Sequence, residues 1–223
     1  MYAPAVEAAR GVRDADPQVA GPAHGDRAAG VVNEEETLRA GAYGLLAALL
    51  RAAPDQTTLE RLRGLDVAER PGEDPVATSL RMLGLAARDS RPGGLADEFQ
   101  ALFVGIGRGE LVPFGSWYLT GFLMERPLSQ LRDDLARLGF ERQPDVREPE
   151  DHVAALCEVM ALLIQDGVAH ETQREFFERH LGPWLGRFCG DLETARTAVF
   201  YRAVGAFGGA FNELEQRYFS MRV

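Results

Sequence analysis

The chain of 223 residues contains no lysine, and all 24 of its basic side chains are arginines. This absence excludes chemistry that needs a lysine Schiff base and the lysine-containing phosphate loop of many nucleotidases. The 34 acidic side chains give a net charge of −10, whereas a nucleic-acid surface needs clustered positive charge. We therefore expect no nucleic-acid partner, and a cationic partner suits this chain better.

Cysteine and long apolar runs are also scarce. The two cysteines, Cys157 and Cys189, provide neither a disulfide framework nor a zinc pattern, which is typical of a reducing cytoplasm. Uncharged stretches such as 40–50 are too short to cross a bilayer as a helix. We expect a soluble, cytoplasmic protein that does not insert into the membrane.

The chain has few β-branched residues. Isoleucine, valine and threonine occur 2, 16 and 8 times, against 31 alanines and 27 leucines. Alanine and leucine lose little rotamer freedom in a helix, whereas β-branched side chains favour strands. With no convincing alternation of apolar residues and no internal repeat, the sequence predicts an all-α fold. We expect a single compact domain of about nine or ten helices.

The first 32 residues differ from the rest. They contain no leucine, isoleucine, phenylalanine or tryptophan, and half of them are alanine, glycine or proline. Such a segment cannot bury enough apolar area to offset the entropy lost on ordering, and it lacks the apolar block of a secretory signal peptide. We predict a disordered tail over 1–32 and a folded domain over 33–223, in which Asn33 caps the first helix.

Apolar spacing and turn residues predict where the helices lie. Ser116 is expected to cap a long helical region, Pro127 to lie in the first turn of a restarted helix and Gly139 to close it. The last helix is expected to break at Gly208-Gly209. The other expected helices begin near residue 34, after Arg91-Pro92 and near His152, and lie near 57–65, 75–88, 171–181, 184–189 and 191–219.

Nothing in the sequence indicates a catalytic, metal or cofactor site. The glycines between Gly105 and Gly109 resemble a phosphate cradle, but the segment lacks lysine and follows no strand, so a hinge or peptide-contacting loop fits better. A di-iron helical bundle needs Glu-x-x-His pairs. The residues three before His152, His170 and His180 are Pro149, Gly167 and Phe177. We therefore expect no catalytic residue, metal or cofactor.

The acids Glu148, Glu150 and Asp151 immediately precede His152. With Pro149 at the first position of a helix, these acids would stabilise the helix through its dipole. Alternatively, they form a carboxylate set for an incoming cation, with His152 held by Asp151 or by a backbone group. A guanidinium ligand would find bidentate acceptors there.

A second cluster is aromatic. Phe122 is expected to lie in the core, as aromatic residues at helical spacing usually do. Trp117 and Tyr118 are adjacent, so their side chains point in different directions, and one of them could line a groove.

Four segments resemble the TorD/DmsD family of cytoplasmic redox-enzyme maturation chaperones, which is related to NarJ. The Glu-Pro-x-Asp-His string of that family is its most diagnostic motif. The matching segments are Glu98 to Gly105, Pro113 to Leu119, Glu148 to Ala154 and Phe176 to Trp184. The resemblance covers roughly 34–220 and leaves the tail and the glycine-rich loop unmatched.

This resemblance implies a non-enzymatic helical chaperone for a molybdenum-cofactor oxidoreductase. Such proteins bind the twin-arginine signal peptide of the catalytic apoenzyme, delay its export and assist cofactor insertion. An acidic corner beside an aromatic groove complements two arginines followed by an apolar stretch. The predicted polar part of the site is Glu148, Asp151 and His152, and the predicted aromatic wall is Gly115, Ser116, Trp117 and Tyr118.

Two other functions stay open on the sequence alone. One is a weak guanine-nucleotide-binding or hydrolysing protein, since guanine-nucleotide binding has been proposed within this family. The loop from Gly105 to Gly109 would be its contact, but the chain has no lysine and no recognisable magnesium motif. The other is a helical ligand-sensing regulator, a class that usually carries a basic helix-turn-helix near one end. Residues 1–32 carry a net charge of −1 and no helical pattern, which disfavours this function. The client oxidoreductase is not identified, and either a monomer or a domain-swapped homodimer is possible, with hinges in the loops before Ser116 and Glu148.

Overall fold

The computed structural model describes residues 34–65, 74–105, 108–141 and 148–221, and in this part of the chain every regular element is a helix. The predicted tail at 1–32 and the predicted cap Asn33 lie outside the described residues. The helices are α1 Glu34–Arg51, α2 Gln56–Arg63, α3 Pro75–Arg88, α4 Pro92–Phe99, η2 Gln100–Val104, α5 Gly115–Thr120, α6 Arg126–Arg137, α7 Val153–Gln165, α8 His170–Phe176, η3 Phe177–Leu181, α9 Gly182–Thr194 and α10 Phe200–Ser220.

The two η segments are π-helical and join their neighbours without a gap. Helix α4 continues into η2, and α8 continues through η3 into α9. The described residues therefore form nine continuous helical stretches. This arrangement confirms the predicted all-α fold of nine or ten helices.

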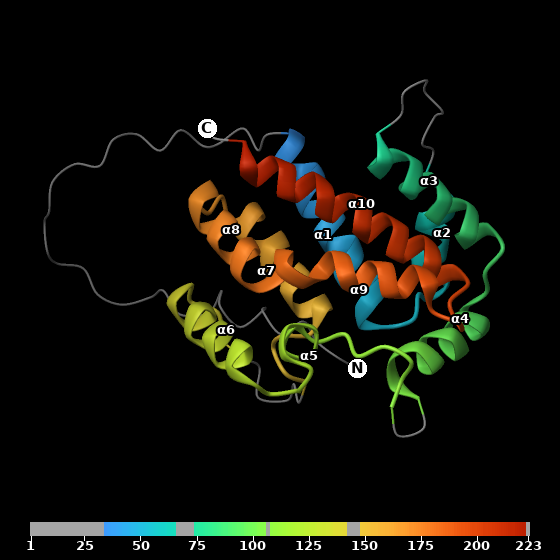
Figure 1. Ribbon diagram of the computed structural model, residues 1–223. Helices are drawn as coiled ribbons and strands as arrows, with labels where there is room; N and C mark the ends of the chain where they lie inside the picture. The colour runs from blue at the N-terminus through green and yellow to red at the C-terminus, as the bar shows by residue number, and fades with distance from the viewer. Residues whose placement is uncertain (1–33, 66–73, 106–107, 142–147, 222–223) are drawn as a thin grey trace, which may run out of the picture.

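Helix α7 belongs to the core and is apolar on almost all sides, as expected of a buried helix. Most of its residues are buried, among them Leu156, Cys157 and Met160. Helix α1 packs against α7, while α10 packs against α9 and α3. Figure 1 shows α9 and α10 side by side, with α5 and α6 on the other side of α9 from α10.

Several local predictions are confirmed. Helix α3 spans the predicted residues 75–88 and begins with Pro75, whose missing N–H costs nothing in a first turn. Pro127 likewise lies in the first turn of α6. Gly139 follows the end of α6 with a φ of +80°, a left-handed conformation that glycine adopts without strain.

The predicted division of the last helices is wrong. No break occurs between 181 and 184 or between 189 and 191, because α8, η3 and α9 are continuous. The chain turns at 195–199 instead, where the carboxylate of Glu98 accepts hydrogen bonds from the N–H groups of Val199 and Tyr201 and fixes the start of α10. These partners are about a hundred residues apart in the sequence, so no local pattern predicts their contact.

Helix α10 also passes through Gly208-Gly209 without the predicted break. The glycines on this face permit close packing instead. A Cβ atom at Gly208 would lie 2.6 Å from Cys189 Sγ, and one at Gly205 would lie 2.8 Å from the Cys189 carbonyl oxygen. The close approach of α9 and α10 therefore depends on glycine.

Candidate ligand-binding pocket between α5, α6 and α7

The two motifs singled out in the sequence lie against each other. The Gly115 N–H donates to the Asp151 carbonyl oxygen, and the Val153 N–H donates to that of Pro113, both at 2.9 Å. These bonds flank an antiparallel bridge between Phe114 and His152, whose rings meet edge to face with 5.0 Å between centroids. The start of α5 is therefore tied to the start of α7.

Asp151 caps helix α5 from outside the helix. Its Oδ2 accepts a hydrogen bond of 2.7 Å from the Ser116 N–H, and only 3 % of the residue is exposed. A carboxylate at a helix N-terminus satisfies a free N–H group and complements the dipole. The prediction that Ser116 itself is the cap is wrong, because Ser116 lies inside the first turn and Phe114 occupies the cap position.

The acids before His152 are not in a first helical turn. The structure therefore contradicts the first of the two alternatives drawn from the sequence, in which these acids stabilise a helix through its dipole. Helix α7 begins only at Val153, and His152 is its N-cap, with Nδ1 accepting from the Ala154 N–H at 3.2 Å. Burial, with a smaller effect from the charge of Arg51, lowers the pKa of His152 to about 4. His152 is therefore neutral at pH 7, as an acceptor at Nδ1 requires.

The two remaining acids of this cluster lie nearer the surface. Glu150 forms an ion pair with Arg132, with 2.9 Å between Oε2 and Nη2. Burial raises the pKa of Glu148, and the nearby charge of Arg51 opposes that rise. Arg51 also pairs with Glu158. The acidic string thus divides into one inward carboxylate, Asp151, and two peripheral ones.

A small pocket of about 70 Å³ opens beside this junction. Its walls include Ser116 and Asp151, together with Gln130 from α6 and Arg179 and His180 from η3. Ser116 Oγ and Asp151 Oδ1 are both buried and find no hydrogen-bond partner among the described residues. Buried polar atoms are nearly always paired, so two unpaired oxygens in one pocket identify a site suited to a hydrogen-bond donor.

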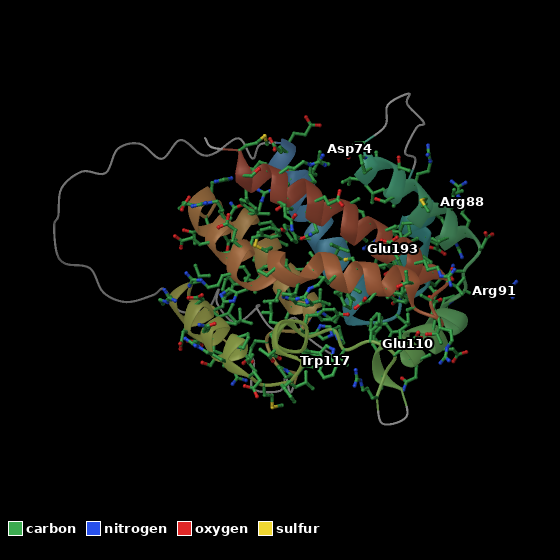
Figure 2. The ribbon with its side chains drawn as sticks, in the orientation of Figure 1. Asp74, Arg88, Arg91, Glu110, Trp117 and Glu193 are labelled. Carbon is green, nitrogen blue, oxygen red and sulfur yellow. The ribbon has the colours of Figure 1, made fainter. Side chains whose placement is uncertain are left out.

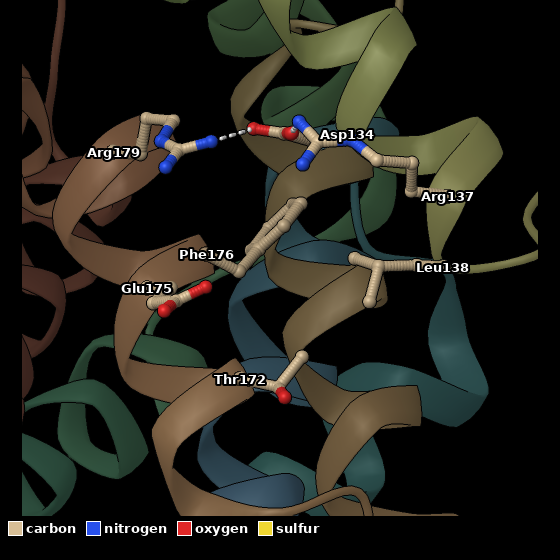
Figure 3. Close-up of a pocket in the computed structure, with 7 residues that line it drawn as sticks. All are labelled: Asp134, Arg137, Leu138, Thr172, Glu175, Phe176 and Arg179. Carbon is tan, nitrogen blue, oxygen red and sulfur yellow. Dashed lines mark hydrogen bonds and ion pairs between the residues drawn. The ribbon is translucent and has the colours of Figure 1, made fainter.

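A second pocket, also about 70 Å³, lies on the other side of Arg179. Figure 3 shows Asp134 between Arg179 and Arg137, and the Arg179 Nη1 lies 2.7 Å from Asp134 Oδ2. The His180 Nε2 lies 2.7 Å from the same oxygen, and since a carboxylate only accepts, Nε2 carries the proton. Sequence reasoning did not place Asp134 in a site, although Arg179 and His180 belong to the fourth matching segment.

Trp117 and Tyr118 diverge, as their adjacency predicts. The Tyr118 ring stacks on Trp184 with 5.5 Å between centroids, and its hydroxyl donates to Asp191 at 2.9 Å. Trp117, labelled in Figure 2, lies instead beneath the Arg108 guanidinium at 4.3 Å. Gly115 lies against Trp184, since a Cβ atom there would be 3.2 Å from the indole nitrogen. These residues hold α5 against its surroundings.

Phe122 is not in the core, contrary to expectation. Helix α5 ends at Thr120, and Gly121 turns the chain with a φ of +81°, so the helical spacing does not reach Phe122. Four apolar side chains are exposed here and form what we call the 119–124 patch: Leu119 (40 %), Phe122 (68 %), Leu123 (47 %) and Met124 (73 %). Leu119 also lines the first pocket, so the patch borders it.

The glycine-rich loop has a conformational explanation. Gly105 has a φ of +60°, and a Cβ atom there would lie 2.1 Å from the Arg108 carbonyl oxygen. Residues 106–107 lie outside the described part of the chain, so the predicted nucleotide contact is not tested.

Among the residues described, His, Cys, Asp and Glu side chains form no group of three that could hold a metal ion. In that same part of the chain, no helix has the length and apolarity to cross a membrane.

Comparison with known proteins identifies the family. The model of the nitrate reductase delta subunit family matches residues 70–190, which is more than half of the chain. The chain belongs to this family. The matched region contains every residue of the first pocket, and the resemblance to the TorD/DmsD and NarJ-related chaperones is confirmed.

Two similar relatives carry the name chaperone protein TorD. The one from Psychrobacter sp. is 27% identical over 72% of this chain and 81% of its own length. The one from Vibrio atlanticus is 26% identical over 67% of this chain and 74% of its own length. A crystal structure from Archaeoglobus fulgidus, provisionally assigned as a redox enzyme maturation protein, is 16% identical with a TM-score of 0.48, over 82% of this chain and 94% of that one.

Proposed function

We propose that this protein is a maturation chaperone for a molybdenum-cofactor oxidoreductase and catalyses no reaction itself. It binds the twin-arginine leader of the catalytic apoenzyme and delays export while the cofactor is inserted. The family assignment and the chaperone names of its relatives support this function. Neither the comparisons nor the described residues support the nucleotide-binding alternative.

The observation that carries the proposal is the pair of unpartnered oxygens, Ser116 Oγ and Asp151 Oδ1. A buried carboxylate oxygen without a donor is costly, and a guanidinium offers five N–H donors in a rigid plane. One arginine head can donate to both oxygens at once. The pocket of about 70 Å³ is small, which suits a single side-chain head group.

The 119–124 patch is suited to the apolar part of the leader. Leu119 lies in the last turn of α5 and the other three side chains follow that helix, and Leu119 belongs to both the patch and the pocket. A peptide whose arginine enters the pocket therefore places the next residues over apolar surface. Such an anchor and flanking apolar face is a common way to recognise an amphipathic peptide.

We assign different roles to the other predicted site residues. His152 and Gly115 are buried and position the pair of oxygens, through the cap of α7 and the contact with Trp184. Tyr118 holds α5 on α9. Trp117 and Glu148 lie at the periphery, where they contact flanking leader residues.

Calorimetric titration with a twin-arginine leader peptide tests this function. The variant Asp151→Asn keeps one oxygen to cap α5 and turns an amide N–H₂ group toward the pocket. We expect a loss of affinity of roughly tenfold to a hundredfold, because a hydrogen bond to a charged group is worth about 1.5–3 kcal/mol. Glu150→Gln is the matched control, since Glu150 pairs with Arg132 outside the pocket.

The circular dichroism and thermal midpoint of Asp151→Asn establish that it folds. A leader whose arginines are replaced by glutamine is expected to bind as weakly to the unmodified chain as the normal leader binds to the variant. If Asp151→Asn folds and binds the leader with unchanged affinity, the assignment of the pocket is wrong.

A further inference from the structure

Helices α9 and α10 form an open groove of about 620 Å³ on the face where Figure 1 shows them side by side. Its floor on α9 consists of glycines one turn apart, Gly182, Gly186 and Gly190, and Gly209 of α10 faces them. None of the residues that line this groove lines the pocket beside Asp151. The groove is thus a separate surface.

The fold does not require all of these glycines. A Cβ atom at Gly190 would meet nothing within 4 Å, and one at Gly209 would make only ordinary contacts, the nearest at 3.6 Å from Glu193 Oε1. An exposed glycine inside a helix is less stable than alanine there because it loses more backbone entropy. What the missing side chains provide is room for another molecule to approach the backbone of α9.

Asn212 points independently to a ligand. The residue lines the groove and is only 3 % exposed, yet its Oδ1 has no hydrogen-bond partner among the described residues. The amide nitrogen of Asn212 lies 3.0 Å from the Cβ position of Gly186, so its side chain lies against the glycine floor. A buried acceptor of this kind favours a ligand that brings a donor.

The charges beside the groove indicate the sign of the ligand. Glu193 and Glu213 are exposed lining residues, and neither forms a hydrogen bond or ion pair within the described residues. Figure 2 labels Glu193, which lies between the ribbons of α9 and α10 in that view. Arg187, the basic residue of the lining, donates to the Tyr118 carbonyl oxygen at 2.7 Å. The two carboxylates outnumber this one guanidinium, so the net charge of the groove lining is negative.

We propose that this groove binds a basic helix of a partner protein. The space between two packed helices is where a third helix fits, and small residues on the floor let the helix axes approach closely. An arginine or lysine on the partner helix donates to Asn212 Oδ1 and lies between Glu193 and Glu213. This site goes beyond leader binding and operates whether or not the pocket beside Asp151 binds arginine.

A helical probe peptide tests the proposal directly on the full chain. The probe is an alanine-rich peptide with three arginines along one face, and its matched counterpart carries glutamines in their place. By ¹⁵N NMR titration we expect saturable shifts at the amides of Gly186 and Gly190 and at the side-chain amide of Asn212. The glutamine counterpart is expected to bind about tenfold more weakly, because the charge-assisted bonds are lost.

Gly190→Ala separates a binding role from a structural one. The methyl group should raise the unfolding midpoint by about 2–4 °C while it weakens probe binding about tenfold, because it blocks close approach. Gly44→Ala is the matched control, since Gly44 is an exposed glycine of α1 with nothing within 4 Å of its Cβ position. The control should stabilise the fold and leave probe binding unchanged.

Glu193→Gln provides a second test that does not alter the glycines, with Asp97→Asn, an exposed carboxylate on α4, as its control. The proposal is overturned if the probe shifts no groove amide at millimolar concentration, or if neither Gly190→Ala nor Glu193→Gln weakens its binding. Asp151→Asn should not change probe binding, and Gly190→Ala should not change leader affinity. The two sites can therefore fail separately.

Discussion

The neutral His152 at the start of α7 makes stability depend on pH in a defined window. In the unfolded chain a histidine takes up its proton near pH 6.5, whereas burial lowers the pKa of His152 in the fold to about 4. The unfolded state thus binds more protons between these values. The contribution of His152 is fully present above pH 6.5 and is lost as the pH falls toward 4.

The size of this contribution follows from the two pKa values. A pKa that is lower by roughly 2.5, at about 1.4 kcal/mol for each pKa unit, corresponds to roughly 3–4 kcal/mol of unfolding free energy. The variant His152→Asn isolates it. Asparagine is a good N-cap and can accept from the Ala154 N–H as His152 does, but it does not titrate.

Urea unfolding of both proteins at several pH values between 4 and 7 measures the effect. Between pH 6.5 and 4 the parent chain is expected to lose about 3 kcal/mol more than the variant. His180 and Glu148, whose pKa values are also shifted, occur in both proteins, so their contributions cancel in the difference. A difference that stays constant with pH would refute the claim that His152 is buried in its neutral form.

Two stability predictions concern contacts between distant parts of the chain. Glu98→Ala leaves N–H groups at the start of α10 without their acceptor and should cost about 1–2 kcal/mol in chemical denaturation, whereas Asp97→Ala, at an exposed position on α4, should cost much less. An equal loss from both would show that the cap contributes nothing. Gly205→Ala places a methyl group 2.8 Å from the Cys189 carbonyl oxygen and should cost about 1–3 kcal/mol. Gly209→Ala has the space for its methyl group, so a loss as large as that of Gly205→Ala would contradict the explanation.

The helices that sequence reasoning placed correctly are those with local signals. Pro75 and Pro127 mark helix starts because their missing N–H is harmless only in a first turn. Gly139 marks an end because it adopts a left-handed conformation. Each of these signals acts within a few residues and needs no knowledge of the rest of the fold.

The features that sequence reasoning missed depend on partners far along the chain. Ser116 follows glycine and looks like a cap, but the carboxylate that caps α5 comes from Asp151. The start of α10 is likewise set by Glu98. Phe122 looked like a core residue because its helical spacing was continued past Gly121, whose left-handed conformation ends α5 after six residues. Both predicted motifs do meet, although their spacing of about 35 residues did not require it.

The carboxylate of Asp151 has two distinct tasks. One oxygen holds the first turn of α5, and the other is buried without a hydrogen-bond partner among the described residues, in a residue that lines the pocket. A donor that binds the pocket oxygen draws negative charge away from the oxygen that accepts from Ser116, so ligand binding and the start of α5 are thermodynamically linked. We therefore expect an occupied pocket to weaken the hydrogen bond that holds the first turn of α5. Hydrogen exchange at the first amides of α5 would report occupancy from within the protein, without any label on the ligand.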